Sequence, residues 1–141
     1  MFVQDRNDVR SHFLSVWEKF THKQQLEALE QLILDVILCH PEYHDVLNKG
    51  RKSLEVDYSP EAGVINPFLH MSMHIAIKEQ IDTDRPAGIR QLCLQLFEIS
   101  KDQHQIEHKI MECLGESLWV AQRNNCMPDE DAYMESVRAL T

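Results

Sequence analysis

Residues that break helices are scarce in this chain, which has four glycines and five prolines among its 141 residues. β-Branched residues rarely occur in runs, so the sequence favours helices over strands. Aromatic residues are also few, at 7%, but hydrophobic residues reach 43% and no low-complexity tract is present. This composition excludes an intrinsically disordered chain and predicts one globular domain over residues 1–141.

Positive charge is scarce as well, since 14 Lys and Arg stand against 23 Asp and Glu, for a formal net charge of −9. Nucleic acids and anionic membrane surfaces both favour basic patches, so we expect neither as a partner. No hydrophobic run reaches the length that a bilayer span needs. The identity of any small-molecule ligand and the oligomeric state stay open, a homodimer included.

Cysteine pairs at metal-ligand spacing are absent too. The four cysteines (Cys39, Cys93, Cys113 and Cys126) are scattered without a CxxC motif, which argues against a tetrathiolate zinc site. The first residues, MFVQDRNDVR, contain no apolar core of a secretory signal. We therefore expect reduced, mostly buried thiols and a cytoplasmic protein.

Hydrophobic residues recur every three or four positions through most of the chain, which predicts an all-α helical bundle of five to six helices with a four-helix core. One helix is expected over residues 8–20. Thr21 and Gln24 have the spacing of a capping box and are expected to open the next helix. The hydrophobic stripe of this second helix reaches His40 and His44, with Pro41 breaking the helix or starting a short new one.

The segment 48–65 has no sustained period and contains two glycines, of which Gly50 is a plausible helix stop. It is expected to be a long loop and a candidate lid. Asn66 and Pro67 supply the cap and the first-turn proline of a helix that reaches about Asp82. Three more helices are expected: one from Pro86, one from Gln103 to Asn124, and a short last one through Tyr133 and Leu140.

Histidines occur in three pairs at a spacing of four residues, in the strings HPEYH, HMSMH and HQIEH. The pairs are His40 and His44, His70 and His74, and His104 and His108. Residues four apart lie on one side of a helix, so both imidazoles can reach one point beside it. Each pair is expected to face the bundle interior, where an imidazole needs partners. A metal ion is a partner that all six rings could share, so these histidines are our candidate ligands.

Two glutamates accompany the last pair: Glu107 precedes His108, and Glu112 lies four residues after it. Glu and His mix on the inward faces of di-iron and di-manganese bundles, so both are candidates for bridging the ions or supporting their ligands. Nitrogen-rich ligation favours a divalent transition metal over magnesium or calcium. We expect iron first, with zinc and manganese as alternatives, and an iron site would bind or reduce dioxygen or peroxide.

Other interpretations stay open, and no catalytic residue is assigned. The histidines could form a buried hydrogen-bonded cluster in a non-catalytic interaction or structural protein. A zinc ion with an open position would instead support hydrolysis or group transfer. HQIEH also matches the H-x-x-E-H motif of inverted zinc peptidases, but that function leaves the other two pairs unexplained.

The strings HPEYH, NPFLHMSMHIAIKEQI, DRPAGI and HKIMECLGESLWVAQRN closely resemble the bacterial domain of unknown function numbered 1841. The resemblance spans residues 13–133 and implies small cytoplasmic helical proteins, without an assigned activity. The paired histidines are distantly similar to hemerythrin-like and DinB-like bundles. Those families imply a non-haem di-iron oxygen site and a mononuclear divalent-metal site, respectively. The sequence departs from the DinB-like pattern, because a DinB-like site needs three histidines and six are paired here.

Overall fold

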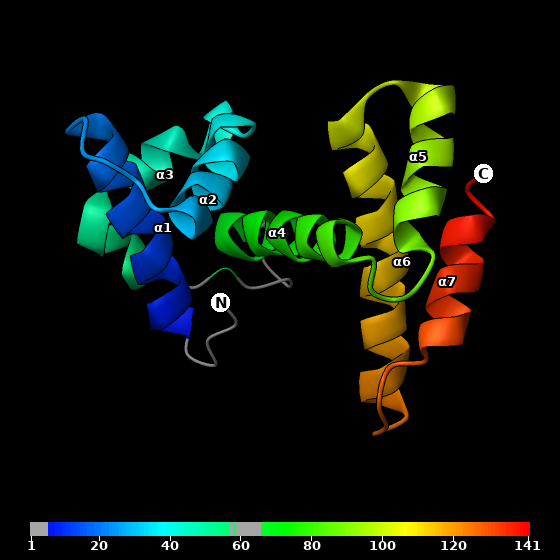
Figure 1. The fold of residues 1–141 in the computed structure, drawn as a ribbon. Coiled ribbons are helices and arrows are strands. Elements are labelled where there is room, and N and C mark those ends of the chain that lie inside the picture. Colours follow the sequence, from blue (N-terminus) through cyan, green and yellow to red (C-terminus); the bar gives the residue numbers. More distant parts are fainter. Residues whose placement is uncertain (1–5, 57, 59–65) are drawn as a thin grey trace. The chain divides into compact units, whose positions relative to one another are not determined.

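The computed structural model describes residues 6–56, 58 and 66–141, and these residues form helices and no strand (Figure 1). This confirms the all-α helical bundle, with seven α-helices instead of five to six because the segment after Pro41 forms a helix of its own. The helices are α1 (Arg6–Thr21), α2 (Ala28–Leu38), α3 (His44–Asn48), α4 (Pro67–Thr83), α5 (Ile89–Ser100), α6 (Gln103–Arg123) and α7 (Glu130–Arg138), with 3₁₀ helices η1 (Pro41–Tyr43) and η2 (Gly50–Leu54). None of these helices is long and hydrophobic enough to cross a bilayer.

The chain divides into two compact units, residues 1–75 (unit 1) and residues 76–141 (unit 2). The boundary falls within α4, so the first part of this helix belongs to unit 1 and the last part to unit 2. A single domain over residues 1–141 stays a prediction of the sequence.

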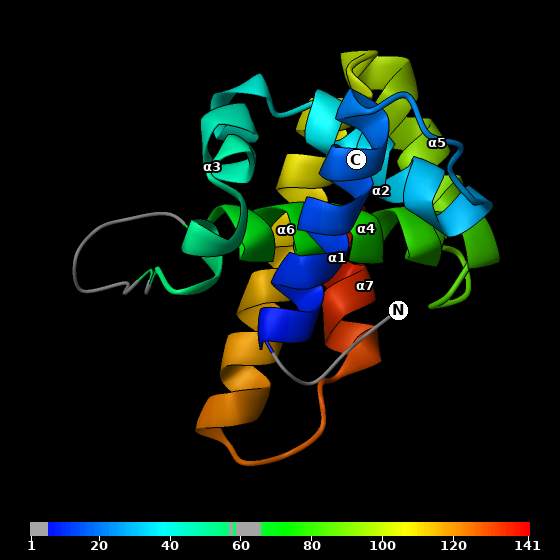
Figure 2. The ribbon, with the colours of Figure 1, turned by 90° about the vertical axis from the view of Figure 1, so that its left-hand side faces the viewer.

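Unit 1 is built on the packing of α1 against α2, which lie side by side in Figure 1 and Figure 2. α1 confirms the helix predicted over residues 8–20. Phe13 and Val16 of α1 belong to one hydrophobic core with Ile33 and Ile37 of α2. The spacing of three and four residues therefore marks the buried faces of both helices.

The start of α2 differs from the prediction. Thr21 ends α1, and its hydroxyl donates to the carbonyl oxygen of Glu18 at 3.0 Å, so Thr21 does not cap the next helix. The capping box is formed by Glu27 and Glu30, and the Glu27 backbone N–H donates to the Glu30 carboxylate at 2.9 Å. Lys19 forms an ion pair with Glu30 at 2.6 Å, which ties α1 to this first turn.

The end of α2 confirms a break at Pro41. α2 ends at Leu38, Pro41 begins η1, and His44 begins α3. The prediction that His40 and His44 lie one turn apart on one helix is therefore wrong. The physical reason is that proline has no N–H for the helical ladder and disfavours the helical conformation of the residue before it. His40 accordingly has φ −128° and ψ 64°, outside the helical region.

Part of the loop predicted over residues 48–65 is helical, because η2 lies within it. Gly50 begins η2, separated from the end of α3 by one residue, and has φ +60°, a conformation that glycine adopts without strain. The buried guanidinium of Arg10 holds the segment that follows, donating to the carbonyl oxygens of residues 53, 54 and 56 at 2.7–3.2 Å. The rest of the candidate lid, at residues 57 and 59–65, lies outside the described residues.

The start of α4 is as predicted. The side-chain oxygen of Asn66 accepts from the backbone N–H groups of Phe68 and Leu69 at 3.0 and 3.2 Å, and Pro67 occupies the first position of the helix. These bonds satisfy N–H groups that have no partner within a helix. The cap fixes where α4 begins, and therefore in which turns of the helix His70 and His74 lie.

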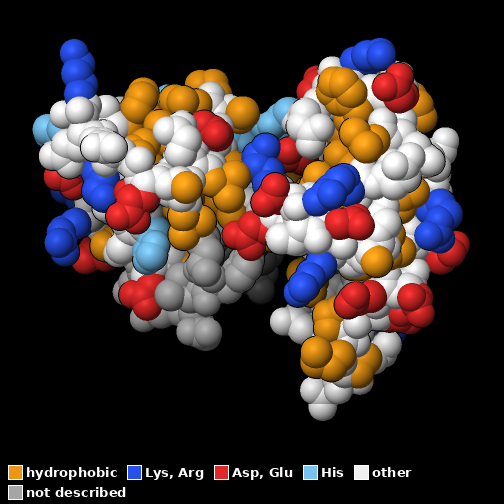
Figure 3. Space-filling model, in the orientation of Figure 1, with side chains coloured by type: hydrophobic (Ala, Val, Ile, Leu, Met, Phe, Trp, Pro, Cys, Tyr) orange, Lys and Arg blue, Asp and Glu red, His pale blue; other side chains and the backbone are white. Residues whose placement is uncertain are grey.

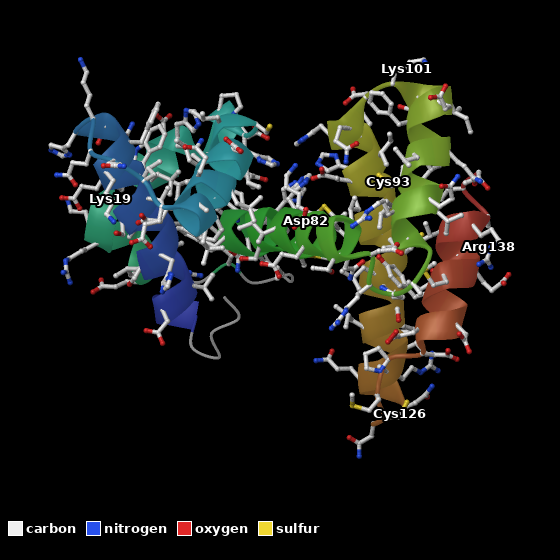
Figure 4. All side chains as sticks on the ribbon, viewed as in Figure 1. Lys19, Asp82, Cys93, Lys101, Cys126 and Arg138 are labelled. Carbon is white, nitrogen blue, oxygen red and sulfur yellow. The ribbon has the colours of Figure 1, made fainter. Side chains whose placement is uncertain are left out.

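Unit 2 contains the end of α4 with α5, α6 and α7. α5 packs against α6, and both pack against α7. α6 confirms the predicted start, because the Asp102 carboxylate accepts from the backbone N–H of Gln105 at 3.2 Å. Lys101, labelled in Figure 4, turns the chain between α5 and α6 with φ +60°.

The predicted start of α5 at Pro86 is too early. The helix begins at Ile89, because the residues before it form a turn in which the Ile89 N–H donates to the carbonyl oxygen of Pro86 at 3.1 Å. Gly88 ends this turn with φ +97°. The Asp84 carboxylate accepts from the N–H groups of Gly88 and Arg90 at 3.2 and 3.0 Å, which holds the turn in place.

Candidate metal centre

Three histidine rings gather in unit 1. The ring centroid of His40 lies 5.0 Å from that of His70 and 4.7 Å from that of His74, and the two α4 rings lie 4.9 Å apart. His40 and His74 are each 1% exposed, and His70 is half-buried. The structure thus brings one histidine of the first predicted pair against both histidines of the second.

A backbone hydrogen bond fixes the chemistry of His40. Its Nδ1 lies 2.7 Å from the carbonyl oxygen of Val36, in the last turn of α2. A carbonyl oxygen only accepts, so Nδ1 carries the hydrogen and the lone pair of the neutral ring is on Nε2. Metal-binding histidines are oriented in this way, by donating their second nitrogen to a carbonyl or carboxylate oxygen.

The pair on α4 has the separation of two metal ligands. The Nε2 atoms of His70 and His74 lie 3.3 Å apart. Bonds of about 2.0–2.1 Å from nitrogen to a tetrahedral ion place two ligand nitrogens about 3.3 Å apart. One nitrogen of His40 and one nitrogen of His74 also lie within 4.8 Å of each other. These three imidazoles could therefore hold one ion after small adjustments of their rings.

His44 is directed elsewhere. Its ring packs on the indole of Trp17, with centroids 4.6 Å apart, and its Nε2 donates to the carbonyl oxygen of Ile37 at 2.9 Å. The break at Pro41 separates this ring from the helix that was expected to carry it. His44 therefore joins α3 to α1 and to the end of α2.

Tyr43 lies at the edge of the three-histidine cluster. Its ring stacks on His40 with centroids 5.4 Å apart and planes 8° apart, and it meets His70 edge-on at 6.1 Å. Burial raises the pKa of the Tyr43 phenol above its usual value, and the nearby Glu42 carboxylate raises it further. The phenol therefore keeps its proton at neutral pH and is a hydrogen-bond donor.

Unit 2 holds the third pair. The rings of His104 and His108 on α6 have centroids 4.3 Å apart, and one nitrogen of each lies within 4.8 Å of the other. Both residues are half-buried. The predicted spacing of one helical turn is confirmed here because α6 is continuous from Gln103 to Arg123.

Glu107 is buried beside this pair, with 1% of its surface exposed. Its carboxylate accepts from the Lys78 ammonium at 2.9 Å and from the Gln103 side-chain amide at 3.1 Å. A buried carboxylate needs such partners, because leaving water without them is costly. The charge of Glu107 is thus compensated by Lys78 of α4. Glu112, the second predicted carboxylate, is exposed to solvent.

The roles of Lys78 and Gln103 as partners of Glu107 were not predicted from the sequence. The one available signal was that Lys78 continues the row of His70 and His74 at the same spacing of four residues. Gln103 likewise lies four residues before Glu107 on α6, where two side chains on one helix are neighbours. Neither signal identifies the partner on a different helix.

A family model described as Domain of unknown function (DUF1841) matches residues 5–139. The chain belongs to this family. The match covers both units, so the histidine groups of each unit lie within the DUF1841 region. No curated protein and no solved structure matches the chain. The likeness to hemerythrin-like and DinB-like bundles is thus supported by no match and stays a similarity of histidine spacing.

Proposed function

We propose that this DUF1841 protein binds a divalent transition-metal ion through His40, His70 and His74. The observation that carries the proposal is the 3.3 Å separation of the Nε2 atoms of His70 and His74. The ring of His40 lies against both, with its Nδ1 engaged by Val36. Burial of two of the three rings also supports it, because buried imidazole nitrogens need polar partners and a metal ion is one such partner.

The ligand set bears on the identity of the ion. Iron came first in the sequence interpretation because Glu107 and Glu112 were expected beside the histidines. Glu107 instead pairs with Lys78, and Glu112 is exposed, so the support for a di-iron or di-manganese site with bridging carboxylates is weaker. Imidazole ligands suit zinc, iron, copper and nickel. We therefore place zinc first, then iron, and manganese last.

Three imidazoles and a water molecule surround zinc in catalytic sites, where the ion lowers the pKa of the water to about 7. The proposed activity is hydrolysis or group transfer at neutral pH, whereas iron held by the same residues would supply dioxygen or peroxide chemistry. The chain itself would contribute orientation and a proton. The bond from His40 to Val36 orients one ligand. Tyr43, whose ring stacks on His40, is the residue that we propose as the proton donor to a bound molecule.

A non-catalytic role is the second candidate. His40 donates to Val36 and His44 donates to Ile37, so both rings of the first pair join segments of unit 1 without a metal. In this case the histidines are buried structural groups of an interaction protein. The two functions differ in one measurable property, because a structural cluster keeps its stability when metal is removed.

Elemental analysis of untagged protein, purified without added metal or chelator, tests the proposal. We expect at least one zinc or iron per chain, and the visible absorption spectrum separates colourless zinc from coloured iron. His70→Asn and His74→Asn should each remove the ion that unit 1 binds, whatever metal depends on unit 2. His12→Asn is the matched control, since His12 is an exposed histidine of α1. Unchanged metal content in the two α4 variants would reject the site.

The pair on α6 is tested separately. The double variant His104→Asn/His108→Asn shows by its metal content how many ions depend on unit 2.

We also propose a cytoplasmic location for the protein. All four cysteines are free, which supports a reducing compartment.

A further inference from the structure

Unit 1 contains a pocket that the metal proposal does not use. Its volume is about 420 Å³, and it lies between one face of α1 and the segment formed by α3 and η2. Pockets that hold small molecules have volumes of roughly 300–1,000 Å³, so this one is large enough for a small ligand. None of the histidines of the proposed metal site lines it.

Hydrophobic side chains line part of the pocket on each of its two sides, among polar ones. Leu14 and Trp17 contribute from α1, and Leu47 and Leu54 contribute from the opposite segment. The indole N–H of Trp17 donates to the side-chain oxygen of Asn48 at 2.8 Å. This bond fixes the orientation of the indole, so the hydrophobic wall is formed before any ligand arrives.

Positive charge is concentrated at the same place. Three of the 14 cationic residues of the chain fall within four positions, Lys49, Arg51 and Lys52, and Arg51 lines the pocket. Acidic and basic side chains are interspersed on the face shown in Figure 3. Three cationic residues within four positions are unusual in a chain whose formal net charge is −9. Among the described residues, the guanidinium of Arg51 has no ion pair or hydrogen bond. A guanidinium matches a carboxylate in a two-point contact.

One acidic residue limits the choice of ligand. Glu18 lines the pocket with Arg51, and its carboxylate repels a second negative charge. A doubly charged phosphate head group is therefore disfavoured relative to a singly charged carboxylate. His22 also lines the pocket, and its Nδ1 donates to the carbonyl oxygen of Glu18 at 2.8 Å, which leaves Nε2 as an acceptor for a hydroxyl or a protonated group.

We propose that this pocket binds a small monocarboxylate with a hydrophobic body. Arg51 receives the carboxylate, and Leu14, Trp17 and Leu47 cover the body. The site is separate from the histidine cluster and goes beyond the proposed metal function. Metal-free protein, prepared with a chelator, therefore suffices for its test, and failure of one proposal leaves the other standing.

Fluorescence of Trp17 provides the readout. The chain has two tryptophans, and the other, Trp119, is 58% exposed on α6, so the Trp119→Phe variant isolates the signal of Trp17. The probes are octanoate, octanol, octylammonium and octyl phosphate. We expect a saturable change with octanoate, binding of octanol weakened about tenfold by loss of the charged contact, and still weaker binding of octylammonium.

A pair of matched variants separates a direct contact from general electrostatics. Arg51→Gln and Lys52→Gln remove the same charge one residue apart, and only Arg51 lines the pocket. Octanoate should bind about tenfold more weakly to Arg51→Gln and nearly normally to Lys52→Gln, whereas octanol should bind equally to both. Circular dichroism confirms that each variant is folded.

Three results would overturn the proposal. They are the absence of saturable octanoate binding, equal losses in Arg51→Gln and Lys52→Gln, and tighter binding of octyl phosphate than of octanoate. Glu18→Gln adds a supporting test, because removing this carboxylate should improve octyl phosphate binding more than octanoate binding. A Glu18→Gln variant that leaves the ratio of the two unchanged would contradict the selection of a single charge.

Discussion

His70 and His74 place their Nε2 atoms 3.3 Å apart on successive turns of α4, at the separation of two ligands of one tetrahedral ion. Without an ion, one of these two nitrogens must donate to the other. With an ion, both lone pairs face the metal. The same two atoms therefore serve either as a hydrogen-bonded pair or as a metal site, and metal removal distinguishes the two.

We predict that a chelator lowers the melting temperature of the wild-type protein. A ligand that binds only the folded state at 100 times its Kd stabilises it by about 2.7 kcal/mol. For a chain of this length that corresponds to a drop of about 8 °C on removal. The His70→Asn/His74→Asn variant should show no drop, as measured by circular dichroism with and without chelator. Equal melting temperatures of the wild type in both conditions would favour the structural histidine cluster.

Lys78→Met should destabilise unit 2, because it removes the cation that pairs with the buried carboxylate of Glu107. Loss of a hydrogen bond to a charged group costs about 2 kcal/mol. Adding Glu107→Leu should restore part of the loss, since it removes the charge that Lys78 compensated. Urea unfolding of the two single variants and the double variant measures the coupling.

The ion pair of Lys101 with Glu98 provides the control for this cycle. Its atoms lie 3.7 Å apart, and the two side chains are 67% and 78% exposed, so Lys101→Met should change the free energy of unfolding by less than about 0.5 kcal/mol. A loss as large as that of Lys78→Met would show that the burial of Glu107 is not the cause.

Helix starts could be predicted from the sequence where one side chain caps the helix by itself. Asn66 and Asp102 accept from backbone N–H groups two or three residues ahead, and both starts were predicted correctly. Thr21 and Gln24 had the spacing of a cap, but Thr21 ends α1 and Gln24 lies in the connection that follows it. Pro86 has the fixed backbone of a first-turn residue, but the turn that Asp84 stabilises comes before the helix.

The candidate site could be predicted only as far as local spacing reaches. His70 and His74 face one another because both lie on α4, and the same holds for His104 and His108 on α6. The approach of His40 to α4 depends on tertiary packing after the chain breaks at Pro41, which spacing does not encode. The charge partner of Glu107 lies on another helix for the same reason.

The four thiols should differ in reactivity. Burial raises the pKa of Cys93 and of Cys113, whereas Cys39 and Cys126 are exposed. The expectation of mostly buried thiols therefore holds for two of the four. Figure 4 labels Cys93 on α5 and Cys126 beyond the end of α6. Only a thiolate reacts rapidly with iodoacetamide. At pH 8 we expect mass spectrometry to show early alkylation of Cys39 and Cys126 and slow alkylation of Cys93 and Cys113. All four should react in denaturant, and fast labelling of Cys93 in the folded protein would contradict its burial.

Stability at alkaline pH should depend on Tyr133, which is 4% exposed and donates its hydroxyl to the side-chain oxygen of Gln80 at 2.7 Å. Burial raises the pKa of this phenol well above its usual value, and the nearby Cys113 adds to the shift. The folded state therefore resists loss of the proton. The stability from this group is complete below pH of about 10, the value in the unfolded chain, and is lost as the pH rises further.

Tyr133→Phe tests this assignment. At pH 7 the variant should lose about 1 kcal/mol of unfolding free energy with the hydrogen bond to Gln80. Between pH 9 and pH 11 (a range of about one unit on either side of the unfolded value) its stability should fall less steeply than that of the wild type, because the variant has no phenol at this position to ionise. Urea unfolding across this range measures both slopes. Parallel slopes would mean that another group controls the alkaline loss and that the phenol of Tyr133 ionises as easily in the folded state as in the unfolded chain.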